Sequence, residues 1–255
     1  MIRRIIDRRS LVSDIKRPTV PCQETAGLYH DGVTFQRART EQQREVRRRA
    51  ILGTAAAMLD EMPVAELSLN ELSRRVGLAK SNVLRYFESR EAVLLELLDR
   101  DFRQWVTELS DELSGGIDPR RPARERGDQL AAIFSRTLAR HSLLCDLVSA
   151  QAGVLEHNVS VEVVVRYKQS ARDSLATLAE LVRRHLPELR EGAWTVCLMA
   201  MVITGALWTH TRPSASTLAA YEADPTLADL RLDLPTALED TVATLITGTL
   251  ARHPG

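Results

Sequence analysis

The feature that most constrains the fold is a single glycine between two short helical runs, in the stretch SLNELSRRVGLAKSNVLRYFESREAVL at residues 68–94. Ser68, followed three residues later by Glu71, predicts a capping box that starts a helix. Gly77 suits the tight turn that ends it, and a second short helix is predicted over 80–86. Neither helix is long enough to be stable alone, so the pair must pack against a further helix.

The spacing of small and apolar residues in this stretch is that of a helix-turn-helix. Counted from Leu69 as position one, such residues stand at positions four, five, eight, ten and fifteen, and the glycine stands at nine. A small fifth residue, Ser73, lets the two helices approach, while the apolar positions pack them together. A short, rigidly held helix fits the DNA major groove, which is about 12 Å wide. The stretch therefore predicts DNA binding.

The remainder of the chain predicts helices and no sheet. Aromatic residues make up only 4% of the 255 residues, whereas Ala, Leu, Arg and Glu recur throughout, which favours helix. The fold class is therefore expected to be all-α. Apolar residues at three- and four-residue spacing, with the breaks between them, predict helices over 41–59, 69–76, 80–86, 90–113, 123–140, 142–155, 160–186, 190–210 and 235–251, with a loop before the last.

The first 40 residues contain prolines and glycines without sustained periodicity, which predicts disorder. Val33 opens a run typical of the start of a helical domain, and valine can be encoded by a codon that also initiates translation. We hypothesise that residues 1–32 are an upstream extension absent from the natural protein. The alternative is a basic arm that reaches into a DNA groove.

Charge is distributed unevenly although the chain is neutral overall. Residues 33–90 hold 11 Lys and Arg against 7 Asp and Glu, whereas residues 91–255 hold 17 against 23. A basic front segment and an acidic rear segment predict a polyanionic partner for the front alone.

Cysteine usage argues against a disulfide framework or a zinc ribbon. Cys22, Cys145 and Cys197 are odd in number, widely spaced and without a CxxC pair, which indicates a reducing compartment. His141 lies one helical turn from Cys145, but no third and fourth ligand follow nearby, so we expect no metal site. We expect no other cofactor.

The sequence predicts no secretory signal and no membrane span. The N-terminus is charged every few residues. The most apolar run, at 193–208, has 16 residues, which is short of the roughly 20 that cross a bilayer. A buried core or interface helix is the better interpretation of this run.

The segment from Glu41 to Leu94 resembles the TetR family of bacterial transcriptional regulators. The match lies in the helix spacing, the turn glycine, the Tyr86-Phe87 pair and the run Ser89-Arg90-Glu91, within GLAKSNVLRYFESREAVL. The resemblance implies a three-helix DNA-binding domain over 39–90, after an N-terminal extension at 1–38. It implies a helical ligand-binding and dimerisation domain over 91–255.

Motif positions imply the DNA-binding residues, with two departures from the family pattern. Leu84 stands where a tyrosine that touches phosphate is usual, and Asn82 stands where Thr or Ser is common. An asparagine amide can pair with adenine, so base reading is expected to differ. The residues implied for DNA contact are Ser68, Lys80, Ser81, Asn82, Arg85, Tyr86 and Arg90. Arg48 of the first helix is a further candidate, with a side chain that simply covers that helix as the alternative.

The resemblance also implies a ligand cavity and a homodimer. The few polarisable or polar-tipped groups of the rear domain are the cavity candidates, with ordinary core packing as the alternative: Trp105, Phe134, His141, Cys145, Tyr167, Trp194 and Met201. The 190–210 helix and the last helix are expected to form a four-helix bundle with a second copy, through Leu207, Leu238, Val242, Leu245 and Ile246. Two copies present two reading heads about 34 Å apart.

The function predicted from these features is that of a cytoplasmic transcriptional regulator, a repressor that a small-molecule effector releases from double-stranded operator DNA. A ligandless dimeric DNA-binding protein with a purely structural rear domain is the alternative. A helical enzyme with a vestigial DNA-binding head is a third hypothesis, but GxSxG, Walker and HExxH motifs are absent. We therefore expect no enzymatic activity.

Overall fold

The protein is all-α, as its sequence predicts. The computed structural model describes residues 28–252, and the side chains of residues 41–252. No strand occurs in that part of the chain. The chain divides into two units, residues 1–45 and residues 46–255, and the contacts described below lie within the second unit.

The first helix is longer than its sequence predicts. α1 spans Leu28–Leu59, so residues 28–38 are helical where disorder was expected. Once a helix has formed, each added residue gains a backbone hydrogen bond without a second nucleation cost, and residues 28–40 contain no proline. The hypotheses on residues 1–32 concern a segment that lies mostly outside the described residues.

Three short elements follow α1, and together with the second half of α1 (46–59) they form the predicted DNA-binding unit, here called the head. The three elements are η1 (Val64–Glu66), α2 (Leu69–Val76) and α3 (Lys80–Val83). α3 ends three residues earlier than predicted and passes into a turn. The backbone leaves the helix there because Phe87, only 3% exposed, enters the core two residues before the extended residue Ser89, which caps the next helix.

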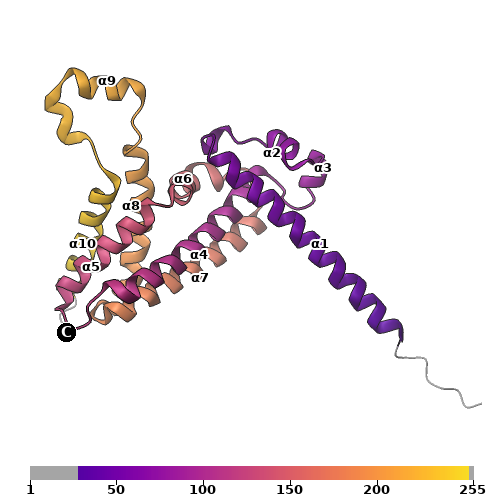
Figure 1. The fold of residues 1–255 in the computed structure, drawn as a ribbon, viewed down its shortest axis with the longest axis horizontal. Helices are drawn as coiled ribbons and strands as arrows, with labels where there is room; N and C mark the ends of the chain where they lie inside the picture. The colour runs from indigo at the N-terminus through magenta and orange to yellow at the C-terminus, as the bar shows by residue number, and fades with distance from the viewer. Residues whose placement is uncertain (1–27, 253–255) are drawn as a thin grey trace, which may run out of the picture. The chain divides into compact units, whose positions relative to one another are not determined.

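A helical bundle forms the rear of the chain. It contains α4 (Arg90–Gly116), α5 (Ala123–Ala139), α6 (Ser142–Ala150), the π-helical turn η2 (Gln151–Leu155), α7 (Val161–His185), η3 (Pro187–Leu189), α8 (Gly192–His210) and α10 (Leu234–Arg252). α4 packs along α7, while α10 packs against both α5 and α8 (Figure 1). α4 thus begins beside the head and continues into the bundle.

α8 is apolar on nearly every face. By length and composition alone it is long and apolar enough to cross a membrane. In the structure, however, it packs against α6, α7 and α10, and it buries seven residues, among them Val196 and Ala200. It is a core helix of the bundle, as the sequence predicts.

Two helical elements interrupt the predicted loop before α10. They are α9 (Ala215–Ala223) and η4 (Pro225–Leu230). Ser214 caps α9 by accepting a hydrogen bond from the Thr217 amide, and Asp224 caps η4 in the same way. Neither element buries a residue, so neither carries the apolar stripe by which sequence periodicity identifies a helix.

Candidate DNA-binding surface and ligand cavity

Local hydrogen bonds hold the α2–turn–α3 unit in shape. The Ser68 hydroxyl oxygen accepts from the Glu71 amide at 3.2 Å, and Gly77 adopts the left-handed conformation, with φ of 74°. Ser73 is 4% exposed, and its hydroxyl donates to the Leu69 carbonyl at 2.6 Å. The N-cap, the turn glycine and the small fifth residue predicted from the sequence are therefore confirmed.

The Glu71 side chain does not complete the capping box. Its carboxylate accepts hydrogen bonds from Arg74, at 2.6 and 2.9 Å, and from Arg75 at 2.9 Å. These hydrogen bonds, that from Arg74 first, lower the pKa of Glu71 to about 2. The carboxylate thus neutralises part of the positive charge on α2.

α3 and the turn that follows it present a row of free polar groups to solvent, which we call the free surface of α3. Lys80, Ser81, Asn82 and Arg85 are exposed, and none of their side chains makes a hydrogen bond or ion pair with the residues that the structure describes. Val83, fully buried, anchors the opposite face of the helix in the core. This surface carries two uncompensated cations and an amide, which suits a polyanion that also offers base edges.

Arg48 is held inside the head and is not part of this free surface. Its Nε donates to Glu96 at 2.6 Å, its Nη1 donates to the Tyr86 carbonyl at 2.9 Å, and its guanidinium lies 4.3 Å from the centre of the Phe87 ring. Arg48 therefore links α1 to the turn after α3 and to α4. The sequence shows only a basic residue on a helix face and gives no sign of these contacts.

Three other predicted contact residues also have structural partners. Arg90 donates to the carbonyls of Ala65 and Leu67, at 3.0 and 2.9 Å, and its Nε contacts the buried Glu91 at 2.8 Å. The Ser68 hydroxyl caps α2, and Tyr86 is half-buried against the core. Of the eight predicted residues, Lys80, Ser81, Asn82 and Arg85 are the ones whose side chains are both exposed and without a polar partner among the described residues.

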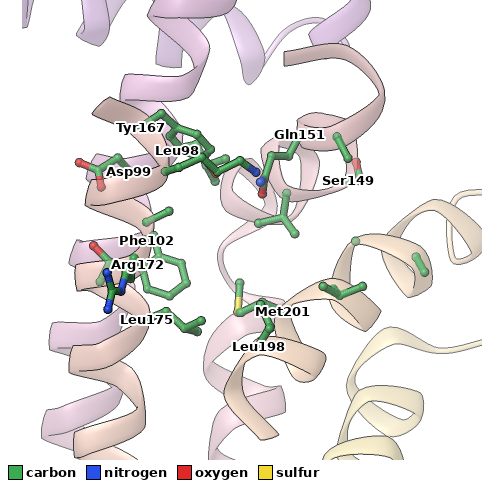
Figure 2. Close-up of a pocket in the computed structure, with 18 of the residues that line it drawn as sticks. Leu98, Asp99, Phe102, Ser149, Gln151, Tyr167, Arg172, Leu175, Leu198 and Met201 are labelled. Carbon is green, nitrogen blue, oxygen red and sulfur yellow. The ribbon is translucent and has the colours of Figure 1, made fainter. Parts of the chain in front are cut away.

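A cavity of about 540 Å³ lies between α4, α6, η2, α7 and α8. Its walls are mostly apolar, with Leu98 and Phe102 from α4, Leu175 from α7 and Leu198 and Met201 from α8 (Figure 2). Three of the seven predicted residues line it, namely Tyr167, Trp194 and Met201. An open cavity of this size and character fits a small, largely apolar molecule.

The other four predicted cavity residues lie elsewhere. Trp105 and Phe134 meet edge to face in the core between α4 and α5, 5.1 Å apart, and Trp105 donates to Thr137 at 3.1 Å. His141 Nε2 lies 2.7 Å from Glu108, and Cys145 is fully buried. For these residues the alternative of ordinary packing holds, because helical spacing cannot distinguish an inter-helix seam from a cavity wall.

The structure shows no metal cluster near His141 or Cys145. Within residues 41–252, no group of three or more His, Cys, Asp and Glu side chains is arranged to hold a metal ion. Burial raises the pKa of the Cys145 thiol to about 12, so this side chain is a neutral thiol in the bundle core.

The apolar stripe of α10 faces its own subunit. Leu238, Val242 and Ile246 are at most 1% exposed. A Cβ on Gly127 of α5 would lie 2.8 Å from the Ile246 side chain, which shows how closely α5 and α10 pack. Within one subunit these three residues are therefore core residues; that they contact a second copy stays a prediction.

The solvent-facing sides of α8 and α10 consist of other residues. Leu207 and Leu245 are half-buried at the margins of the core. The exposed positions of α8 include Thr195, Val202 and Ala206, and those of α10 include Thr244 and Thr247. Val202 is 58% exposed, and small neighbouring side chains would allow another helix to approach closely.

Two family models match the chain. The model described as "Tetracyclin repressor-like, C-terminal domain" matches residues 99–253, and the model described as "Bacterial regulatory proteins, tetR family" matches residues 51–97. Together they cover the helix-turn-helix, the bundle and the cavity.

Similar proteins agree with these matches. The HTH-type transcriptional regulator EthR of Mycobacterium tuberculosis is 29% identical over 133 residues, which are 52% of this chain and 58% of the relative. EthR of Mycolicibacterium smegmatis is 42% identical over 53 residues, which are 21% of this chain and 24% of that protein. The chain thus spans under two thirds of the length of these curated relatives.

Solved structures show the same fold. A TetR transcriptional regulator from Rhodococcus sp. RHA1 superimposes with a TM-score of 0.51 and 14% identity, over 84% of this chain and 98% of that one. At this identity the likeness concerns the fold alone.

Proposed function

Because the chain belongs to the tetR family of bacterial regulatory proteins, we propose that it is a sequence-specific DNA-binding transcriptional regulator and not an enzyme. The free surface of α3 is the observation that carries this proposal. Lys80 and Arg85 are exposed cations without partners among the described residues, and Asn82 is an exposed amide between them. These exposed, unpaired groups do not stabilise the fold, so binding to a polyanion is the role that fits them.

α3 enters the major groove in this proposal. Lys80 and Arg85 contact phosphates or guanine edges, Asn82 contacts an adenine edge, and Ser81 contacts either. The starts of α2 and α4 supply backbone amides for phosphates. Arg48 and Arg90 act indirectly, because their hydrogen bonds fix the elements around α3.

The regulator acts as a homodimer through the exposed sides of α8 and α10. One head reads only a few base pairs, whereas a two-fold dimer reads two half-sites about 34 Å apart. Val202, Ala206 and Thr244 lie on this surface and leave the buried stripe of α10 within each subunit.

A small-molecule effector in the cavity releases the repressor from its operator. α4 contributes Leu98 and Phe102 to the cavity wall. The same helix begins at Arg90, which donates a hydrogen bond to the Ala65 carbonyl of η1. If α4 has two positions and the ligand binds the protein more tightly in one of them, the ligand increases the population of that conformation. It thereby changes the fraction of protein whose DNA-binding unit fits the operator. The cavity favours this function over a ligandless regulator. By family, the protein acts in the bacterial cytoplasm, where the operator lies.

Selection of genomic DNA by the purified protein tests this function. Sheared fragments from the source bacterium are incubated with the protein, and the retained fragments are sequenced. We expect enrichment of an inverted repeat whose half-sites are separated by about one helical turn or a multiple of it. Uniform recovery of fragments, without an enriched sequence, contradicts the proposal.

A further inference from the structure

Tyr167 is a buried polar residue with an unused hydroxyl group. It lies on α7, is 8% exposed and lines the cavity (Figure 2). Its hydroxyl makes no hydrogen bond with the residues that the structure describes. In that part of the chain, every fully enclosed side-chain nitrogen or oxygen has a partner, so the Tyr167 hydroxyl must reach accessible space. The cavity that Tyr167 lines provides that space.

Gln151, Lys168 and Asp99 of the cavity wall are already paired, the first two with Glu156 outside the lining. Glu156 accepts from Gln151 at 2.8 Å and from Lys168 at 2.6 Å. Asp99 accepts from Ser170 at 2.7 Å and pairs with Arg103 at 2.9 Å. A ligand that met these groups would have to displace existing bonds, whereas the Tyr167 hydroxyl is available at no such cost.

Ser149 and Thr209 are paired in the same manner. Their hydroxyls donate to backbone carbonyls of their own helices, at 2.8 and 3.1 Å. Arg172 has no partner among the described residues, but it is exposed, so water solvates its charge. Ser174 is 7% exposed and also lines the cavity, but its hydroxyl oxygen already accepts a hydrogen bond from Arg103 Nε at 3.4 Å. Tyr167 is therefore the buried wall residue whose polar group has no partner among the described residues.

Local charge decides which ligand group suits Tyr167. Burial raises the pKa of the phenol, and the negative charges of Glu156 and Asp99 raise it further. Tyr167 thus stays protonated at physiological pH and is a constant donor. Glu156 is paired with Lys168, and Asp99 is paired with Arg103, so the wall offers no unpaired buried cation that would compensate a ligand anion beside the hydroxyl. A neutral acceptor is therefore favoured.

We infer, on the basis of the ligand-release function proposed above, that the effector is an uncharged, mostly apolar molecule with one hydrogen-bond acceptor such as a carbonyl oxygen. Tyr167 donates to this acceptor, while Phe102, Leu175 and Leu198 enclose the apolar remainder. Tyr167 is the residue that determines the polarity of the ligand.

Three shape-matched probes test this inference on the full-length protein: hexanophenone, hexylbenzene and 6-phenylhexanoate. They present a neutral acceptor, no acceptor and an anion, respectively. We expect hexanophenone to bind most tightly by titration calorimetry. Tyr167→Phe should weaken hexanophenone binding about threefold to tenfold, the usual effect of one lost neutral hydrogen bond, and should leave hexylbenzene binding within about twofold.

Tyr221→Phe is the matched control, because Tyr221 lies on α9 and does not line the cavity. It should bind all three probes as the wild type does. Unchanged hexanophenone affinity in Tyr167→Phe overturns the inference, and so does tighter binding of 6-phenylhexanoate or a failure of all three probes to bind. DNA selection is scored without probes, so failure of the DNA-binding function is distinguishable from failure of this inference.

Discussion

Arg48 of α1 and Glu96 of α4 form an ion pair across 48 residues of sequence, with Arg48 Nε 2.6 Å from a carboxylate oxygen. Both side chains are about a third exposed or less. The pair connects α1 to α4, and α4 lines the cavity from Leu98 onward. A residue predicted to contact DNA is thus part of the joint between head and bundle.

Arg48→Ala should lower the free energy of unfolding by about 1–3 kcal/mol, because it removes hydrogen bonds to Glu96 and Tyr86 and the stacking on Phe87. Denaturant unfolding measures this effect. The salt dependence of DNA binding should keep its slope, since no phosphate contact is lost. Unchanged stability together with a slope reduced by about one would assign Arg48 to the DNA instead.

Gly77→Ala should destabilise the protein by about 1–2 kcal/mol, because a residue with a Cβ is strained at φ of 74°. Gly53→Ala is the matched control. Gly53 lies within α1, and a Cβ at either glycine meets nothing within 4 Å, so sterics do not distinguish the two sites. Gly53→Ala should stabilise by about 0.5–1 kcal/mol. Melting temperatures that shift in the same direction would contradict this explanation.

Cys145 and Cys197 should resist alkylation in the native protein. Burial raises the pKa of each thiol to about 12, so at pH 8 only about one thiol in ten thousand is the reactive thiolate. Iodoacetamide labelling followed by peptide mass spectrometry should show both cysteines modified at least about a hundredfold faster in urea. Rapid labelling of either in the native protein would mean that the bundle core is open.

Val202→Asp should convert the dimer into a folded monomer. Val202 is 58% exposed within one subunit, so a carboxylate there leaves the fold of the subunit intact, but it opposes burial against a second copy. Because Val202 also lines the cavity, this variant tests the interface and not ligand binding. Val165→Asp is the control, on the exposed side of α7 at 48% exposure, and should remain dimeric by light scattering. A dimeric Val202→Asp protein would place the interface elsewhere.

The sequence predicts the α2–turn–α3 unit well because its determinants are local. The Ser68 cap, the Gly77 turn and the burial of Ser73 each depend on residues within one or two turns of chain. The ion pair of Arg48 depends on a residue 48 positions away, and helical periodicity in the sequence does not show which distant residues come into contact. For the same reason, Trp105 and Tyr167 look alike in the sequence, although one fills the core and the other lines the cavity.

The α10 stripe shows the same limit. Leu238, Val242 and Ile246 have the spacing of a buried face, and they are buried, but spacing does not say whether a subunit or its partner covers that face. α9 was missed for the opposite reason, since a helix that buries nothing has no stripe to detect.

Binding of an operator by the free surface of α3 is the central claim, and a gel-shift titration of the double variant Lys80→Ala/Asn82→Ala tests it most directly. Wild-type and variant proteins are titrated onto the selected operator at about 150 mM salt with excess nonspecific DNA. The wild type should form a discrete, competitor-resistant complex, and the variant should lose about a hundredfold or more in affinity while it remains a folded dimer. A variant that binds the operator as tightly as the wild type would contradict the claim.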